Sequence, residues 1–254
     1  MSANAPDWLI ARPIAHRGLH DAATGVVENT LGAADAAMRD GFAIECDVQL
    51  SRDGEAMVFH DDALGRLARA RGLVVERSVA ELQAIRLRAS AERIPTLPQL
   101  LTRIAGRTPL ICELKSRFDG DLRLAERVAA LAREYRGPLA LKSFDPAPIA
   151  HLRARHGGQW PLGVVAEASY QGRYWRDLSP AQKETCAAFA HYPDTRPDFL
   201  SWCVDDLPHP TPFLLRELKA LPVMVWTVRT AAQRQAALRW GDQIIFEGEA
   251  TAQD

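Results

Sequence analysis

Short apolar segments alternate with helical patterns along most of the chain. Between the apolar segments, hydrophobic residues recur at helical spacing, as in Leu122–Tyr135 and Ala231–Trp240. The apolar segments are rich in Val, Ile and Leu and predict eight strands: Pro13–Gly18, Ala43–Leu50, Leu110–Lys115, Leu139–Phe144, Leu162–Glu167, Phe199–Val204, Val223–Val228 and Gln243–Phe246. Strands that are apolar on both faces and separated by helices indicate a parallel sheet covered on both sides. Eight such units in 254 residues predict an α/β fold, the (β/α)8 TIM barrel.

Capping residues support this division into elements. Ser78, with Glu81 three residues later, predicts a capping box at the start of a helix. Three further helix starts are predicted where a capping side chain is followed by proline: Asp145-Pro146, Ser179-Pro180 and Thr211-Pro212.

One stretch departs from the alternation. After a short strand that ends at His60, residues 61–96 contain an arginine-rich segment and a short helix. We interpret them as a small insertion after the second strand unit, at the rim where barrel loops line the active site. No second domain is needed, so a single domain over residues 1–254 is expected.

Composition and charge narrow the function classes. Hydrophobic residues make up 47% of the chain, charged residues 25%, and the net charge is −1, which gives no basic footprint for nucleic acid. No apolar stretch approaches the roughly 20 residues that span a bilayer, so stable membrane insertion is not expected. The polar N-terminus lacks a secretory pattern, and the four cysteines lack paired spacing, which favours a cytoplasmic location. The oligomeric state is not indicated.

Two carboxylates share one face of the second predicted strand. Side chains alternate along a strand, so Glu45 and Asp47 point the same way and Cys46 points the other way. Inside a barrel the two charges would repel each other unless a cation compensates, and oxygen ligands favour Mg²⁺ or Ca²⁺. Taken alone, the pair is equally consistent with rim charges that have arginine partners.

The next strand repeats this arrangement. Glu113 and Lys115 share a face, which offers a third carboxylate ligand and a positive charge for an anionic substrate. A structural ion pair would explain this strand by itself. Polar residues of the same parity at the ends of two neighbouring strands favour a metal site instead.

Two histidines also end predicted strands. His16 is followed by Arg17, and His60 follows the strand after the Asp53-Gly54 turn. Histidines at such positions suit a general acid and a general base, and a guanidinium can hold a phosphate bidentately. A lone histidine is more often structural, so the argument rests on the combination. Together with a cation and an ammonium group, these residues indicate displacement at phosphorus.

The order of the motifs along the chain resembles that of a known family. The motifs occur in the order found in the glycerophosphodiester phosphodiesterases, and the likeness runs from about Ile14 to Phe246. The early motifs are His16-Arg17-Gly18, Glu28-Asn29-Thr30, Glu45-x-Asp47, Asp53-Gly54, His60-Asp61 and Glu113-x-Lys115. The later ones are Ser143-Phe144-Asp145 and Trp226-Thr227-Val228.

The resemblance implies a (β/α)8 barrel with a small insertion, and a role for each site residue. It implies one divalent ion, Ca²⁺ or Mg²⁺, on Glu45, Asp47 and Glu113. It implies His16 and His60 as general acid and base, in an order that the sequence does not decide, and Arg17 and Lys115 on the phosphate. Trp226 would stack on the glycerol or alcohol part of the substrate, although an aromatic that fills the barrel interior is an equal alternative.

The implied reaction splits a small-molecule glycerophosphodiester into sn-glycerol 3-phosphate and an alcohol, a step of glycerol and lipid metabolism. The glycerol 2-hydroxyl would be the first nucleophile, and water would open the resulting cyclic phosphate. The alternative is a lysophospholipase D activity on lipids with the same residues. It calls for an apolar surface near the site, whereas residues 61–94 are arginine-rich. The sequence does not indicate the alcohol preference.

The family resemblance does not decide the role of two segments. Asn29 and Thr30 could act as helix caps or belong to the site. The last strand, Gln243–Phe246, is followed by Glu247-Gly248, whereas relatives usually carry a Thr-Asp pair and a Pro in this region. The role of residues 243–248 is therefore not predicted.

Overall fold

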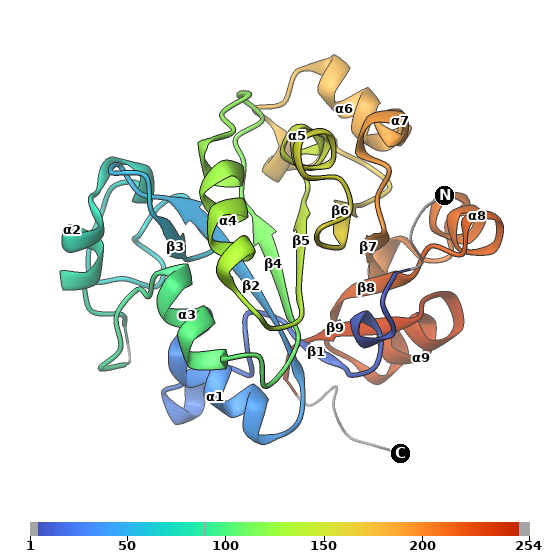
Figure 1. Ribbon diagram of the computed structural model, residues 1–254. Coiled ribbons are helices and arrows are strands. Elements are labelled where there is room, and N and C mark those ends of the chain that lie inside the picture. The colour runs from blue at the N-terminus through green and yellow to red at the C-terminus, as the bar shows by residue number, and fades with distance from the viewer. Residues whose placement is uncertain (1–4, 89, 249–254) are drawn as a thin grey trace. The chain divides into compact units, whose positions relative to one another are not determined.

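The computed structural model describes residues 5–88 and 90–248 (Figure 1). These residues fall into two compact units. The N-terminal unit comprises residues 14–115 and 121–139. The C-terminal unit comprises the described residues before 14, residues 116–120 and the described residues from 140 onwards. The single domain over residues 1–254 stays a prediction, and its ends at 1–4 and 249–254, together with position 89 of the insertion, lie outside the described residues.

The strands of the N-terminal unit surround β2. They are β1 (Ile14–Ala15), β2 (Ala43–Leu50), β3 (Ala56–Val58) and β4 (Leu110–Leu114). Strand β2 pairs in parallel with β1 and β4, and antiparallel with β3. All eight residues of β2 are buried, including the polar Glu45, Asp47 and Gln49. Strand β1 is shorter than predicted because the backbone of Arg17 and Gly18 turns into the left-handed region, with φ of 59° and 78°.

Most helices of this unit begin at side-chain caps, whereas the last, which follows Leu122, has no side-chain cap. They are α1 (Leu31–Arg39), α2 (Val79–Ala84), α3 (Leu97–Ile104) and α4 (Arg123–Glu134), with short 3-10 turns η2 (Ala22–Thr24) and η3 (Val74–Glu76). The predicted capping box of Ser78 and Glu81 is confirmed at α2. Thr96 caps α3 in the same way, with Gln99 as its partner. These caps satisfy backbone N–H groups that the helices leave without an internal partner.

The insertion has its own apolar core. The structure shows the predicted short helix, α2, within residues 61–96. The buried residues beneath it are Val27, Met57, Phe59, Leu64, Ala68, Val74, Leu82, Leu87 and Ile94. Because three of them, Val27, Met57 and Phe59, come from outside the insertion, burial of this apolar surface packs the insertion against the strands of its own unit.

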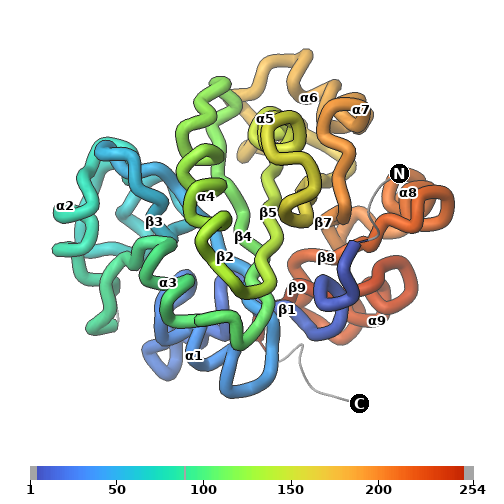
Figure 2. The backbone as a smooth tube through the Cα atoms, in the orientation of Figure 1, coloured from blue at the N-terminus to red at the C-terminus, as the bar shows by residue number. Residues whose placement is uncertain are grey.

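The C-terminal unit repeats a simple parallel pattern. Its strands are β5 (Leu139–Ser143), β6 (Leu162–Ala166), β7 (Phe199–Cys203), β8 (Val223–Val228) and β9 (Gln243–Phe246), of which only Leu139 belongs to the other unit. They pair in sequence order, all in parallel. Figure 2 traces the backbone through this unit, from yellow-green at β5 to red at β9. The predicted bounds of β8 and β9 are confirmed. The divergent last strand therefore forms a strand, although its register with β8 shifts between Val225 and Val228. Glu247 after it accepts a hydrogen bond from Arg229 Nε at 2.7 Å.

The helices of the C-terminal unit correct one sequence prediction. They are α5 (Pro146–His156), α6 (Pro180–Ala187), α7 (Tyr192–Thr195), α8 (Pro210–Lys219) and α9 (Ala231–Trp240), with 3-10 turns η1 (Asp7–Leu9), η4 (Arg173–Trp175) and η5 (Val204–Asp206). Asp145 and Ser179 cap α5 and α6 as predicted. The prediction that Thr211 caps the next helix is wrong: α8 begins at Pro210, and His209 Nδ1 accepts the cap bond from Thr211 N. The pair His209-Pro210, just upstream of Thr211-Pro212, supplies an equivalent helix start.

The helices that the structure describes include none long and apolar enough to cross a membrane.

Candidate metal and phosphate site

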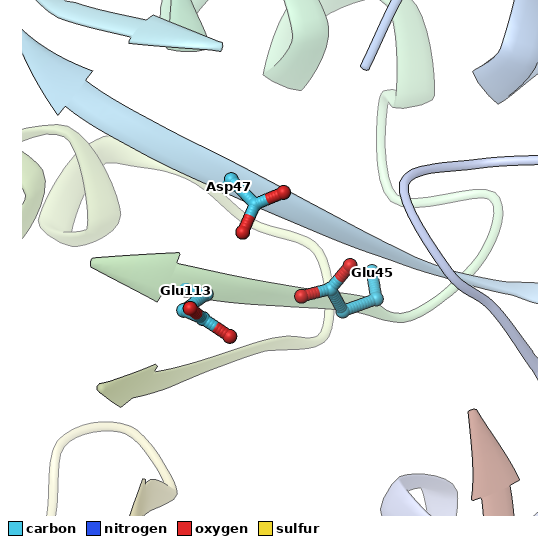
Figure 3. A group of neighbouring side chains, drawn as sticks. All are labelled: Glu45, Asp47 and Glu113. Atoms are coloured by element: carbon cyan, nitrogen blue, oxygen red, sulfur yellow. The ribbon is translucent and has the colours of Figure 1, made fainter. Parts of the chain in front are cut away.

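Three buried carboxylates meet at the centre of the N-terminal unit. Strand alternation points Glu45 and Asp47 to one face of β2, and the parallel register pairs Asp47 with Glu113 on β4 (Figure 3). One carboxylate oxygen from each residue lies within 4.8 Å of the other two. Glu45 is 0% exposed, Asp47 1% and Glu113 5%. Three buried negative groups this close together require compensating positive charge, and an all-carboxylate donor set fits a hard divalent cation.

The cysteines between these carboxylates lie on the opposite face. Cys46 pairs in register with Cys112, and both are buried. A hydrogen bond between the two thiols, together with burial, raises the pKa of Cys46 well above its ordinary value. Both cysteines are free thiols that pack in the apolar interior, so the predicted strand parity is confirmed.

Two positively charged side chains lie against the carboxylates. Lys115 Nζ is 2.9 Å from Glu113 Oε1 and 3.4 Å from Asp47 Oδ1. Arg17 Nε is 3.3 Å from Asp47 Oδ2, but in the described residues this buried N–H has no hydrogen-bond partner. Burial alone would raise the pKa of Asp47, but the surrounding positive groups, Lys115 foremost, hold it well below its usual range.

A tight turn after β1 aims the backbone of Arg17 at the site. Arg17 N donates to Glu45 Oε2 at 3.0 Å, which ties the end of β1 to the carboxylate cluster. Gly18 follows with a positive φ, and a Cβ at this position would lie 2.8 Å from the Cβ of Ala33 in α1. Only glycine fits there without displacing the helix.

Asn29 belongs to the site, and Thr30 is the helix cap. Asn29 Nδ2 donates to Asp47 Oδ2 at 2.9 Å, and Asn29 Oδ1 accepts from Asp47 N at 3.1 Å. Asn29 holds the left-handed conformation, with φ of 57°, and its N–H donates to the carbonyl of Arg17. Thr30 Oγ1 accepts from Ala33 N and caps α1. The sequence left these two roles open; the available signal was an Asn, a residue that tolerates the left-handed conformation, directly before a Thr that can cap a helix.

The two histidines differ in their surroundings. His16 is 9% exposed, and its Nε2 lies 3.9 Å from Glu45 Oε2. His60 Nδ1 lies 2.7 Å from Asp61 Oδ1, so with an ionised Asp61 the Nδ1 carries the proton and donates it. This contact fixes the ring orientation and leaves Nε2 of His60 for proton transfer.

The structure thus brings seven predicted residues together within the N-terminal unit. They are His16, Arg17, Glu45, Asp47, His60, Glu113 and Lys115. Trp226 lies on β8 in the C-terminal unit, where its Nε1 donates to Ser201 O at 3.0 Å and its ring meets Phe144 edge to face at 5.3 Å. Its role as a substrate contact stays a prediction. The sequence did not identify Arg66 as a partner of the site; it pairs with Glu28 and Asp61.

A cluster of this kind can bind an anionic ester and move protons. Carboxylates can hold a cation, guanidinium and ammonium groups attract a phosphoryl group, and imidazoles can accept and donate protons. The combination is suited to displacement at phosphorus.

Solved structures establish the fold class. A phosphodiesterase of Oleispira antarctica, solved with its product sn-glycerol 3-phosphate, is 21% identical to the chain. The likeness covers 94% of this chain and 93% of that one, with a TM-score of 0.75. With eight parallel strands that alternate with helices in the described residues, the predicted (β/α)8 TIM barrel is confirmed.

Sequence relatives point to one family. The Bacillus subtilis protein YhdW, provisionally named a glycerophosphodiester phosphodiesterase, is 34% identical over 188 residues, which are 70% of this chain and 73% of YhdW. A glycerophosphodiester phosphodiesterase of Caldanaerobacter subterraneus is 32% identical over 48% of this chain and 52% of its own. A sequence model of the Glycerophosphoryl diester phosphodiesterase family matches residues 16–247. The chain therefore belongs to the glycerophosphoryl diester phosphodiesterase family.

Proposed function

We propose that the chain hydrolyses small-molecule glycerophosphodiesters to sn-glycerol 3-phosphate and an alcohol, in a metal-dependent reaction. The observation that carries this proposal is the buried group of Glu45, Asp47 and Glu113, with Arg17 and Lys115 beside it. Family membership supports the reaction class, and the product bound to the Oleispira antarctica enzyme supports the glycerol phosphate half.

Glu45, Asp47 and Glu113 would hold one divalent ion, Ca²⁺ or Mg²⁺. The donor chemistry supports this choice, because all three ligands are carboxylates and none of them is a thiolate or an imidazole. When bound, such an ion supplies positive charge against the negative charge that develops on the non-bridging phosphoryl oxygens.

Arg17 and Lys115 hold and orient the phosphoryl group. The N–H of Arg17 Nε, buried and 3.3 Å from Asp47, is a donor that an anionic oxygen can accept from. Lys115 contributes a compact positive charge from the neighbouring strand. Because Asn29 anchors both the backbone and the carboxylate of Asp47, the phosphate-binding cations face a fixed partner.

His16 and His60 move the protons. One takes the proton from the glycerol 2-hydroxyl as its oxygen attacks phosphorus, and the other protonates the alcohol oxygen as the P–O bond breaks. Water then opens the cyclic phosphate, with the two proton transfers reversed. Asp61 keeps the His60 ring oriented throughout. Trp226 of the C-terminal unit is proposed to contact the glycerol or alcohol group.

An assay over a panel of substrates tests this proposal. Purified protein with Ca²⁺ or Mg²⁺ should release sn-glycerol 3-phosphate from glycerophosphocholine, glycerophosphoethanolamine or glycerophosphoglycerol, and chelation should stop the release. No release from any diester would refute the proposal. Hydrolysis of a lysophospholipid in preference to all three would support the lysophospholipase D alternative instead. A cytoplasmic location and a role in glycerol and lipid metabolism belong to the same proposal.

A further inference from the structure

One arginine of the insertion joins two carboxylates beside the candidate site. Arg66 Nη1 donates to Glu28 Oε2 at 2.9 Å, and Nη2 donates to Glu28 Oε1 at 2.8 Å. Toward Asp61, Nε donates to Oδ2 at 2.5 Å and Nη2 to Oδ1 at 2.9 Å. The guanidinium therefore forms a bidentate contact with each of the two carboxylates, using four of its five N–H donors.

The oxygens shared by Arg66 are the ones that contact proposed site residues. Glu28 Oε1 also accepts from Arg17 Nη1 at 2.7 Å. Asp61 Oδ1 also lies 2.7 Å from Nδ1 of His60. Arg66 Nη2 thus connects, through one oxygen on each side, the guanidinium that would bind phosphate and the imidazole that would move a proton.

The charges of this group are strongly coupled. Burial alone would raise the pKa of Glu28, but hydrogen bonds and attraction from Arg66 and Arg17 lower it overall. The pKa of Asp61 is also held well below its usual range, since bonds to His60 and Arg66 outweigh its burial. The side chain of Glu28 is 11% exposed and that of Asp61 23%, so water screens these pairs only partly.

We propose that Arg66 is a positioning residue that makes the insertion part of the catalytic centre, by fixing Glu28 against Arg17 and Asp61 against His60. This inference rests on the proposed function. Without Arg66 both carboxylates lose their bidentate partner and gain rotamer freedom. Arg17 then holds the phosphate less well, which raises KM, and the His60 ring is less well oriented, which lowers kcat.

A second arginine of the insertion provides a matched control. Arg93 Nη1 donates to the carbonyl oxygens of Gln83 and Ala84, at 3.1 and 2.6 Å, and so stabilises the insertion itself. Within the described residues, Arg93 forms no hydrogen bond or ion pair with Glu28 or Asp61. Arg93→Ala therefore reports the effect of a loosened insertion without the loss of the carboxylate contacts.

The kinetic test compares three variants with the wild type. Arg66→Ala should lower kcat/KM by about 10–100-fold, with both kcat and KM affected, as for other residues that orient ligating or catalytic groups. Arg66→Lys should recover little of this loss, because an ammonium group cannot bind two carboxylates bidentately. Arg93→Ala should keep the wild-type kcat and KM. Equal losses in Arg66→Ala and Arg93→Ala, or wild-type kinetics in Arg66→Ala, would overturn the inference.

Proton NMR of the His60 ring gives a readout that does not depend on turnover. In the wild type and in Arg93→Ala, the Nδ1–H proton bonded to Asp61 should give one downfield resonance, assigned by its loss in His60→Gln. In Arg66→Ala this resonance should shift or broaden. An unchanged resonance in a folded Arg66→Ala variant would contradict the inference. If the wild type hydrolyses no diester while Arg66→Ala still shifts or broadens this resonance, the proposed function alone would be refuted.

Discussion

The two units share an architecture but differ in the side chains that their strands carry. In the N-terminal unit, β2 and β4 bear buried carboxylates against Arg17 and Lys115. In the C-terminal unit, aromatic rings gather instead: Phe144, after β5, contacts Trp175 at 5.1 Å and Trp226 at 5.3 Å. The same alternation of strands and helices thus supports a charged cluster in one unit and an aromatic cluster in the other. The side chains on the strands, and not the fold alone, determine which kind of cluster each unit carries.

Buried acids in the two units also differ in the direction of their pKa shifts. Asp47 is buried, but the cations beside it lower its pKa. Glu167 follows β6 and accepts a hydrogen bond from Trp175 Nε1, yet burial raises its pKa, as burial also does for Asp145. A buried acid remains ionised where a cation lies beside it, which is the condition that a metal ligand requires.

The largest effect should follow from removal of a metal ligand. Glu113→Gln keeps the size of the side chain and removes its charge, so we expect kcat/KM with Ca²⁺ or Mg²⁺ to fall by about 10³-fold or more, a loss of several kcal/mol in transition-state stabilisation. The matched control is Cys112→Ala, one residue away on the opposite face of β4, which should keep its activity. If Glu113→Gln kept more than a tenth of wild-type activity, the carboxylate cluster that distinguishes the N-terminal unit would not be required for catalysis.

The next largest loss of activity should follow from removal of either candidate catalytic histidine. His16→Ala and His60→Ala should each lower kcat by about 10²–10⁴-fold, the range for loss of a general acid or base. A glycerophosphodiester of p-nitrophenol needs no proton on its leaving group, so the variant that has lost the general acid should recover most of its rate on that substrate. Activity within tenfold of the wild type in both variants would show that neither histidine transfers the proton.

In the C-terminal unit, a buried histidine should affect stability and not turnover. Burial lowers the pKa of His191 from 6.5 to about 4. Above pH 6.5 the ring is neutral in both states; as the pH falls toward 4 the unfolded state takes up the proton first, so stability is lost over this range. The loss should approach about 3 kcal/mol at pH 4. Urea unfolding at pH 7 and pH 4 measures it.

His191→Gln provides the comparison for this pH effect. Its stability should change less between pH 7 and pH 4 than that of the wild type, because Gln does not titrate. Its kcat at pH 7 should equal the wild-type value. An equal pH dependence in both proteins would mean that other groups cause the acid destabilisation.

The smallest effect should come from Trp226, which brings the aromatic cluster into the comparison. If its half-buried ring packs on substrate, Trp226→Ala should raise KM by about two- to tenfold, the range for one aromatic contact, with little change in kcat. Trp202→Phe is the control, since Trp202 is buried on β7 and stacks on His209. A KM unchanged across the diester panel would leave Trp226 as a packing residue.

Much of the site could be predicted because it depends on local periodicity. Alternation along β2 places Glu45 and Asp47 on one face whatever the rest of the chain does, and the bounds of β2 agree with the apolar run that predicted it. The pairing of Asp47 with Glu113 follows once β2 and β4 are neighbours in parallel register. The roles of the site residues in catalysis stay predictions.

The remainder depends on contacts that the local pattern does not encode. Arg66 reaches Glu28 across 38 residues of sequence, and an arginine-rich segment gives no sign of which arginine will do so. The left-handed turn at Arg17 shortened β1 because its φ is set by the bonds to Glu45 and by the close approach of Gly18 to α1. At α8, two adjacent proline signals offered equivalent starts, and local propensity did not distinguish them.

The central claim is that the carboxylates of the N-terminal unit form a single metal site on which the reaction depends. Calorimetric titration of the metal-free protein with Ca²⁺ or Mg²⁺, with turnover of glycerophosphocholine followed in parallel, tests it most directly. We predict one ion per chain, activity that rises in proportion to occupancy, and loss of both in Glu45→Gln. Full turnover in the metal-free protein, or an unchanged titration in Glu45→Gln, would contradict the claim.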